Sequence, residues 1–392
     1  MKKLKLLIKF SIAMFTIIAI TYPIAAFSDI PFVKKYRDLY IETAMTTNSH
    51  QWLATAFLPE YIVNDVVERN KKDQESMQNF TVSWENVSYA STYEEPVVEE
   101  KPDYEALFFE KYWELDTEDF RNFLKENPDL LENGYDKLFI NNSKHEYDIK
   151  SVFDERIYLL DAENNTIIFE VTGSGFVGKL ATIKDPSQVR LAKSKTLGSY
   201  GTILRDFYND EEPVLAINCS GFKDVEDKGN GGVVVGSLII DGVEYGNPKS
   251  KYFLFGQKFD DKFYIEKYDE SLTKDYRWAA QFLPALIING EKKVEGSFGF
   301  GIQPRTAIGQ STKGEMLLLI IDGRQVGYSI GATVSDEADI MLKHDAYQAV
   351  NADGGSSSLM WYDGKNITKP SSKNNLGRYL PDALVVDKAV KE

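Results

Sequence analysis

Residues 333–358 read TVSDEADIMLKHDAYQAVNADGGSSS and join a helix pattern to a strand pattern in one short stretch. Apolar residues recur at helical spacing over residues 334–346, and Thr333 or Ser335 has the side chain needed to cap the helix start. The pattern leads directly into a strand that bears Asn351 and Asp353. This stretch therefore predicts a helix packed beside a strand.

Asp353 stands at the mouth of a turn formed by Gly354, Gly355, Ser356 and Ser357. Adjacent glycines allow positive φ and let a ligand approach the backbone N–H groups closely. Asp-Gly and Gly-Gly are also common in surface hairpin turns. Taken alone, the turn leaves both a ligand site and a plain hairpin open.

The second half of the chain is rich in short, apolar, β-branched runs, which predict strands. They lie at residues 166–171, 214–217, 233–240, 283–288 and 316–321. Three runs end in Asp-Gly or Asn-Gly, at 241–242, 289–290 and 322–323, which favours hairpin turns. Repeated strand–turn units of this kind predict an α+β fold with a mixed sheet over residues 150–392.

The N-terminus carries Lys2, Lys3, Lys5 and Lys9, followed by an uncharged run over residues 10–27. This run approaches the thickness of a bilayer, and the basic flank is expected to stay in the cytoplasm. We therefore expect residues 1–28 to be a single-pass anchor in the cell membrane, with the rest of the chain outside. Removal of the segment as a signal peptide is the alternative.

Three further regions lie between the anchor and the sheet-rich part. Residues 29–70 read as helical, with a polar stretch at 46–50 that fits a helix break with an N-cap. Residues 71–103 are acidic and proline-containing, which predicts a mobile, extended linker. Residues 104–149 read as helical again, with Asp116 as a start signal.

The composition excludes several classes of function. The chain has 392 residues and a net charge of −15, which argues against a nucleic-acid partner, so an anionic substrate must be held by local arginines. The single cysteine, Cys219, excludes an internal disulfide and is expected to be buried rather than a nucleophile. The three histidines show no zinc-ligand spacing, and no metal site or cofactor is predicted.

Residues 173–178 fit GxGxxG after a strand, but Asp185-Pro186 interrupts where a nucleotide fold needs a long helix. The motif is therefore interpreted as a glycine-rich strand connection. Residues 296–301 lack the lysine of a phosphate-binding loop and are expected to form a flexible loop beside the site.

Three polar clusters follow strands and have the chemistry of a site: Asn218 with its neighbours, Arg305 among small residues, and Asp322 with Arg324. Guanidinium groups match phosphate oxygens and keep their charge when partly buried. Alternatives stay open, because Arg305 could close the fold through an ion pair and Arg324 could pair with Asp322 or Asp336.

Four stretches in this order, at residues 216–222, 304–309, 322–325 and 349–357, resemble the phosphodiester glycosidase family. The resemblance covers roughly residues 150–387 and includes Arg378, which is similar to the closing arginine of the family. Asp382 departs from the pattern, since asparagine is common there. The anchor and residues 43–51 resemble membrane-attached bacterial members associated with exopolysaccharide biosynthesis.

This resemblance implies hydrolysis of the glycosidic bond of sugar-1-phosphodiesters, in cell-surface polysaccharides or teichoic acid-like polymers. It implies Asp353 as nucleophile or base and Asp322 as its partner. Asn218 would hold sugar hydroxyls, and the phosphate would be bound by the following residues: Arg305, Arg324, Arg378, Gly354, Gly355, Ser356 and Ser357. The competing interpretation is a non-catalytic protein that binds or assembles glycans. A divalent cation shared by Asp322 and Asp353 has no support from calcium-loop spacing.

Overall fold

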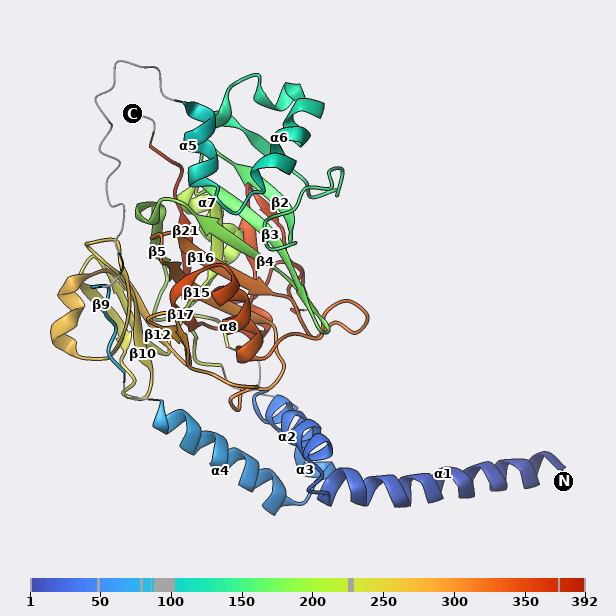
Figure 1. Ribbon diagram of the computed structural model, residues 1–392. Helices are drawn as coiled ribbons and strands as arrows, with labels where there is room; N and C mark the ends of the chain where they lie inside the picture. Colours follow the sequence, from blue (N-terminus) through green and yellow to red (C-terminus); the bar gives the residue numbers. More distant parts are fainter. Residues whose placement is uncertain are drawn as a thin grey trace.

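The computed structural model describes residues 2–47, 50–77, 80–85, 87, 103–224, 229–372 and 374–390. A sheet-rich domain stands above three short helices, and a long helix, α1 (Lys2–Phe27), extends sideways from them (Figure 1). The predicted α+β class is confirmed. The predicted mixture of parallel and antiparallel strands is not found, because all strand pairs among the described residues are antiparallel.

The central sheet has nine strands in the order β1-β2-β3-β4-β16-β15-β17-β13-β14. Its strands are β1 (Phe139–Asn141), β2 (Arg156–Asp161), β3 (Thr166–Gly173), β4 (Phe176–Ile183), β13 (Ala285–Ile288), β14 (Glu291–Lys292), β15 (Arg305–Ser311), β16 (Met316–Ile321) and β17 (Ala346–Asn351).

Two smaller sheets of five strands pack on one face of the central sheet. One has the order β11-β10-β12-β8-β9, from β8 (Gly236–Ile240), β9 (Val243–Asn247), β10 (Phe253–Lys258), β11 (Phe263–Lys267) and β12 (Tyr276–Phe282). The other has the order β19-β18-β7-β21-β5, from β5 (Val189–Lys193), β7 (Leu215–Asn218), β18 (Met360–Tyr362), β19 (Lys365–Asn366) and β21 (Asp382–Val386). A short pair, β6 (Thr202–Ile203) and β20 (Tyr379–Leu380), completes the strands.

Strand β16 shows why the central sheet forms. All of its side chains are buried, and they alternate between two hydrophobic cores, with Met316, Leu318 and Ile320 in one and Leu317, Leu319 and Ile321 in the other. Because successive side chains of a strand point to opposite faces, a strand covered on both faces needs a continuous apolar run.

Helices cover the other face of the sheet: α5 (Tyr104–Lys111), α6 (Thr117–Glu126) and α8 (Val334–Lys343). Asp116 caps α6 and Thr333 caps α8 through a capping box with Asp336, so both predicted start signals are confirmed. Helix α7 (Leu204–Glu211) packs against the sheet that contains β7 and β21.

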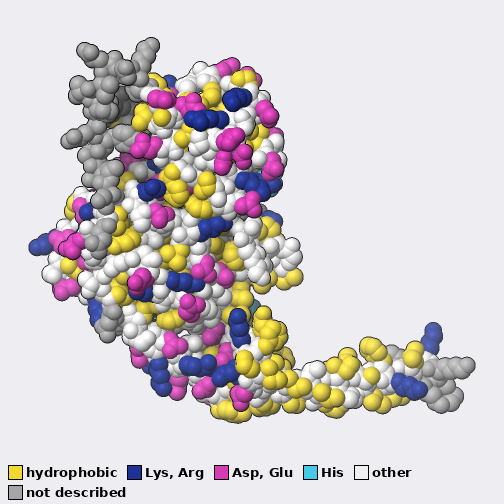
Figure 2. Space-filling model, in the orientation of Figure 1, with side chains coloured by type: hydrophobic (Ala, Val, Ile, Leu, Met, Phe, Trp, Pro, Cys, Tyr) yellow, Lys and Arg dark blue, Asp and Glu magenta, His cyan; other side chains and the backbone are white. Residues whose placement is uncertain are grey.

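The predicted helical region after the anchor consists of α2 (Pro31–Met45), α3 (Trp52–Phe57) and α4 (Glu60–Ser76). The three helices share a small core of their own, formed by Ile41, Ala44, Ala54, Ile62, Val63 and Val66. Helix α1 lies outside this core, and its residues Ile8–Phe27 are long and apolar enough to cross a membrane. Hydrophobic side chains cover its surface (Figure 2).

The turn predictions are confirmed at two of three places. Asp241-Gly242 and Asn289-Gly290 have positive φ at both residues and connect β8 to β9 and β13 to β14. The third, at 322–323, is wrong, because β16 continues into a loop that reaches α8 instead of a hairpin. The glycine-rich residues 173–178 form the β3–β4 hairpin, as interpreted.

The predicted linker, residues 71–103, is in part structured. Helix α4 continues to Ser76. Trp84 is buried against the five-stranded sheet that contains β11, where its indole N–H donates to the Phe263 carbonyl at 3.0 Å. The prediction of a mobile segment is therefore wrong at these residues, because one large aromatic side chain is enough to fix a polar segment to a core. The glutamates at 94, 95, 99 and 100 lie outside the described residues.

Candidate functional site

Five strand ends meet at one edge of the domain. Strand pairing places the start of β15 beside the end of β16, with Arg305 opposite Ile321, and places Ala307 opposite Asn351 at the end of β17. In the neighbouring sheet the end of β7 lies beside the start of β21. The segments that follow or precede these strands therefore meet at this edge.

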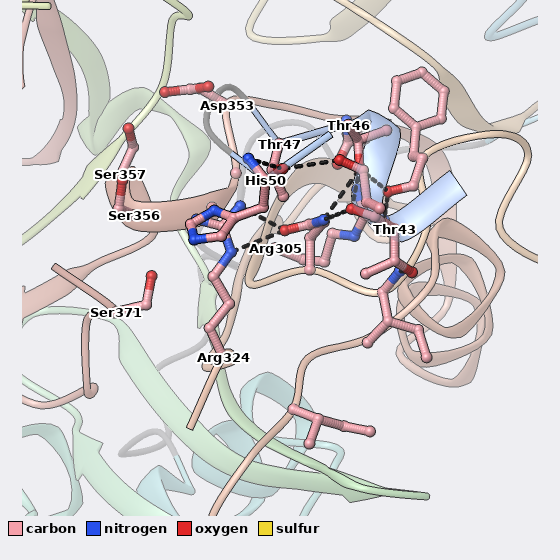
Figure 3. Close-up of a pocket in the computed structure, with 18 of the residues that line it drawn as sticks. Thr43, Thr46, Thr47, His50, Arg305, Arg324, Asp353, Ser356, Ser357 and Ser371 are labelled. Carbon is pink, nitrogen blue, oxygen red and sulfur yellow. Dashed lines mark hydrogen bonds between the residues drawn. The ribbon is translucent and has the colours of Figure 1, made fainter. Parts of the chain in front are cut away.

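A cavity of about 1400 Å³ opens at this edge. One wall comes from the sheet-rich domain, including Asp224, Arg324, Asp353, Gly354, Gly355, Ser356, Ser357 and Arg378. The opposite wall comes from α2 and the segment after it, including Tyr36, Leu39, Tyr40, Thr43, Thr46, Thr47, His50 and Leu53. Figure 3 shows residues of both walls facing each other.

Asp353 lies directly after β17 and contributes its carboxyl group to the cavity. Its backbone is fixed from both sides, because its N–H donates to the Cys219 carbonyl at 3.1 Å and its carbonyl accepts from the Asn218 side chain. Burial raises the pKa of Asp353 to about 7, while a hydrogen bond from Ser357 and the charge of Arg378 act in the opposite direction. A carboxyl group that titrates near neutrality can exchange protons with a substrate.

The glycine–serine turn after Asp353 lines the cavity through all four predicted residues. Gly355 has φ +64°, and a Cβ atom there would lie 3.2 Å from Nη2 of Arg324. A Cβ atom on Gly354 would lie 2.8 Å from the Pro304 carbonyl oxygen. The two glycines therefore let the turn approach both an arginine and a neighbouring strand, which a larger residue would prevent.

Arg324 lines the cavity and is oriented by Gln303, whose side-chain oxygen accepts from its Nε at 2.9 Å and also from its Nη2. The amide nitrogen of Gln303 in turn donates to the Thr43 carbonyl at 3.2 Å and to Thr46 Oγ1 at 3.0 Å. A hydrogen-bonded chain therefore runs from the end of α2, through Gln303, to Arg324 (Figure 3). Helix α2 therefore contributes both to the lining of the cavity and to the position of Arg324.

Arg378 lines the same cavity from the segment before β20. Its Nη2 lies 2.8 Å from Asp224, its Nη1 donates to Ser356 Oγ at 3.3 Å, and its guanidinium lies over the Phe222 ring. These contacts fix the planar group next to the turn that carries Asp353.

Arg305 lines the cavity, but its guanidinium is bound by the surrounding fold. It is 4% exposed, its Nε donates to the Ala332 carbonyl at 2.9 Å, and its Nη2 donates to the carbonyls of Phe300 and Gly301. The carboxylate of Glu337 lies 3.9 Å from its Nε, and burial raises the pKa of Glu337 to about 8. The geometry favours the alternative in which Arg305 closes the fold, here by holding the loop of residues 296–301.

Asp322 does not line the cavity and is not brought to Asp353. Its carboxylate accepts from the Tyr328 hydroxyl and from the backbone N–H of Lys369, both at 2.8 Å. Burial raises the pKa of Asp322 to about 6. It therefore organises the loop that carries Arg324, and a cation shared with Asp353 has no geometric support.

Asn218 is fully buried beneath the cavity rather than exposed to a sugar. Its side-chain oxygen accepts from Thr306 Oγ1 and from the Leu359 N–H, and its side-chain nitrogen donates to the carbonyl of Asp353. It therefore helps to fix the position of Asp353 and does not line the cavity. Cys219 is also fully buried, as expected.

Sequence reasoning missed several site residues. Asp224, two residues beyond the cluster at 218–222, pairs with Arg378 and could have been found by extending that cluster. Asp382 is buried, accepts from the Ser220 N–H, and raises the pKa of Asp353 by its charge. Asp382 could have been found from the sequence, because it stands where the family pattern commonly has asparagine. No group of three or more acidic, histidine or cysteine residues suited to a metal occurs among the described residues.

Residues 211–387 match the sequence model of the phosphodiester glycosidase family. The chain is 36% identical over 70 residues to N-acetylglucosamine-1-phosphodiester alpha-N-acetylglucosaminidase of Bos taurus, covering 18% of this chain and 13% of that protein. It is 28% identical over 195 residues to the SPbeta prophage-derived uncharacterized protein YomE of Bacillus subtilis (strain 168), covering 44% of this chain and 28% of that protein. The chain thus spans less than a third of the length of either relative.

Two solved structures are also similar. The zebrafish N-acetylglucosamine-1-phosphodiester alpha-N-acetylglucosaminidase catalytic domain, auto-inhibited by its pro-peptide, has 18% identity and a TM-score of 0.48 over 57% of this chain and 83% of that chain. A hypothetical protein from Synechocystis has 14% identity and a TM-score of 0.44 over 59% of this chain and 63% of that chain. The family match itself begins after β6 and includes the turn at Asp353. Residues 211–387 of this chain are therefore similar to the phosphodiester glycosidase family.

Proposed function

We propose that this protein hydrolyses the bond between C1 of a sugar and the phosphate oxygen of a sugar-1-phosphodiester. One observation carries the proposal. A carboxyl group with a pKa of about 7, that of Asp353, faces a cavity also lined by the guanidinium groups of Arg324 and Arg378. The match of residues 211–387 to the sequence model of the phosphodiester glycosidase family supports the same reaction.

The arginines supply the charge that binds the phosphate. Arg324 and Arg378 are each held by a hydrogen-bonding partner, so their forks are oriented before a ligand arrives. Because the chain as a whole carries a net charge of −15, this local positive charge is what distinguishes the site from the rest of the molecule for an anion.

Asp353 supplies the carboxylate for attack at C1, either as nucleophile or as base for water. The C1–O bond breaks, the oxygen of water bonds to C1, and the phosphate leaves as a monoester. Because a phosphate ester is a stable anion, the reaction needs less help from a general acid than ordinary glycoside hydrolysis does. This fits a cavity in which the other lining carboxylate, Asp224, is committed to Arg378.

We place this activity outside the cytoplasm, on phosphate-linked glycans of the cell surface. Helix α1 then serves as a membrane anchor, with its lysine-rich start in the cytoplasm. The acidic character of the chain makes nucleic acid an unsuitable partner.

The purified full-length protein, tested on N-acetylglucosamine 1-(methyl phosphate) and related sugars, should release free sugar. Asp353→Asn should reduce this release at least a thousandfold with an unchanged Tm or a higher one. Asp241→Asn, in the β8–β9 turn, is the matched control and should leave the rate unchanged, because asparagine also suits a positive φ. A wild type that binds these esters without cleaving them would instead be a glycan-binding protein.

A further inference from the structure

Helix α2, which forms one wall of the cavity, is hydrogen-bonded to the end of α1. Arg37 of α2 donates through Nη1 to the carbonyls of Ala26 and Ser28, at 3.1 and 3.2 Å. The hydroxyl of Tyr22 in α1 donates to the Phe57 carbonyl at the end of α3 at 3.0 Å. The apolar helix and the cavity wall are therefore held together as one structural unit.

The cavity lies close to the end of the apolar helix. Helix α2 begins four residues after α1 ends, and its first residue lining the cavity is Tyr36. Five residues of helix span about 8 Å, so Tyr36 lies no farther than that from the start of α2 along its axis. The headgroup layer of a bilayer is roughly 5–8 Å thick on each side. With α1 in a membrane, the cavity begins at the level of the headgroups.

Both sides of the cavity carry exposed apolar side chains. On the helical side, the residues at least 41% exposed are Ile30, Phe32, Tyr36, Tyr40, Trp52, Phe57 and Tyr61. On the other side, the loop after Arg324 exposes Val326 (97%), Tyr328 (42%) and Ile330 (46%). We call these residues the apolar rim. Tyrosine and tryptophan are enriched where proteins meet the membrane surface, and a soluble protein seldom exposes so large a patch.

The rim continues the surface of α1. Figure 2 shows hydrophobic surface running from α1 onto the helices at its base, and Figure 1 shows the orange loop between β16 and α8 on the side toward which α1 extends. The loop is fixed there, since the Ile330 N–H donates to the Gly175 carbonyl in the β3–β4 hairpin at 2.8 Å.

The interior of the cavity has a polar end and an apolar flank. The end near Asp353 has arginines and serines, while Tyr36, Leu39, Leu53 and Ile330 add an apolar flank. The volume, about 1400 Å³, exceeds the 300–1,000 Å³ usual for a drug-sized ligand. A sugar phosphate alone would fill the polar end and leave the apolar flank in contact with water.

We infer that the natural substrate is a sugar-1-phosphate esterified to a long-chain lipid alcohol that resides in the membrane. This inference rests on the proposed hydrolysis and adds the lipid as the second ester group. The sugar and phosphate occupy the polar end, and the first segment of the lipid chain lies along the apolar flank toward the bilayer. Water cleaves the C1–O bond, so that free sugar leaves and the lipid phosphate monoester stays in the membrane.

The test uses the full-length protein in phosphatidylcholine vesicles with two substrates that share one sugar-1-phosphate head. One carries a methyl ester and is soluble; the other carries a polyprenyl ester and is embedded in the vesicles. Released sugar is measured at equal bulk concentrations. We expect the polyprenyl ester to be cleaved at least tenfold faster.

The variant Val326→Asp places a charge on the rim outside the cavity, and Phe259→Asp places one on the β10–β11 turn, at a residue 61% exposed. We expect Val326→Asp to slow cleavage of the polyprenyl ester at least fivefold and to leave the methyl ester unaffected, while Phe259→Asp changes neither. Cleavage of the methyl ester alone, or equal effects of the two variants, would overturn the lipid substrate and leave the proposed hydrolysis standing. If neither ester is cleaved, both proposals fail.

Discussion

Replacing Gln303 tests whether helix α2 controls the candidate active site. Gln303 is 6% exposed and is the link between Thr46 at the end of α2 and Arg324. The variant Gln303→Leu removes the acceptor of two N–H donors of Arg324, Nε at 2.9 Å and Nη2. The guanidinium then loses the contact that orients its fork toward the cavity.

The expected loss follows from the charge on the donor. A hydrogen bond to a charged group contributes about 1.5–3 kcal/mol, which corresponds to a roughly 10- to 150-fold lower kcat/KM for a sugar-1-phosphodiester. Most of this loss should appear as a higher KM rather than a lower kcat, because the phosphate charge is present in both the bound substrate and the transition state. Thr46→Val removes only one acceptor of Gln303 and should cost about 2- to 10-fold.

The assay is release of free sugar over a range of substrate concentrations, with Tm measured for each variant. Gln325→Leu is the matched control, because Gln325 is in the same loop but donates to the Lys369 carbonyl at 2.8 Å. Gln303→Leu with less than a twofold change in kcat/KM and an unchanged Tm would refute the role of α2 in positioning Arg324.

The remaining predictions concern pH and stability. With Asp353 as base, kcat/KM should rise with pH through about 7, the pKa of this half-buried carboxyl group, because only the deprotonated form is active. Asp382→Asn removes a negative charge near Asp353 and should move the rise of kcat/KM to lower pH by about one pH unit or less. A shift of this rise to higher pH would contradict the assignment of Asp353 as the base. In the wild type, the Lys184 ammonium lies 2.6 Å from Glu114 and 2.7 Å from Glu315. Lys184→Met removes this cation and leaves both carboxylates buried without a partner charge. The free energy of unfolding, from urea titration, should fall by about 3–5 kcal/mol, and a loss below about 1 kcal/mol would contradict this.

The strand framework could be predicted because it depends on local patterns. The apolar run of β16 and the Asp241-Gly242 turn need only neighbours in sequence to be recognised. The turn at Asp322 could not be predicted in the same way, because its carboxylate accepts from the backbone of Lys369, 47 residues away. Trp84 is similar, since its burial depends on a strand far along the chain.

The composition of the site was predictable, but the division of roles was not. Arg305 and Arg324 look alike in sequence and both line the cavity, and burial alone distinguishes the arginine that also closes a loop from the exposed one. The contribution of α2 was hidden for the same reason, because Thr46 and Gln303 are 257 residues apart. Asp353 and the glycines after it were found because their types and order are unusual in a purely structural turn.

The most direct test of the central claim is to follow which bond breaks when the wild-type protein turns over a sugar-1-phosphodiester in water enriched in oxygen-18. Phosphorus-31 NMR of the phosphate monoester product distinguishes the two outcomes through the isotope shift. Attack at C1, assisted by Asp353, predicts a phosphate without oxygen-18. A phosphate that carries the label would mean attack at phosphorus and would contradict the assignment of this site as a glycosidase.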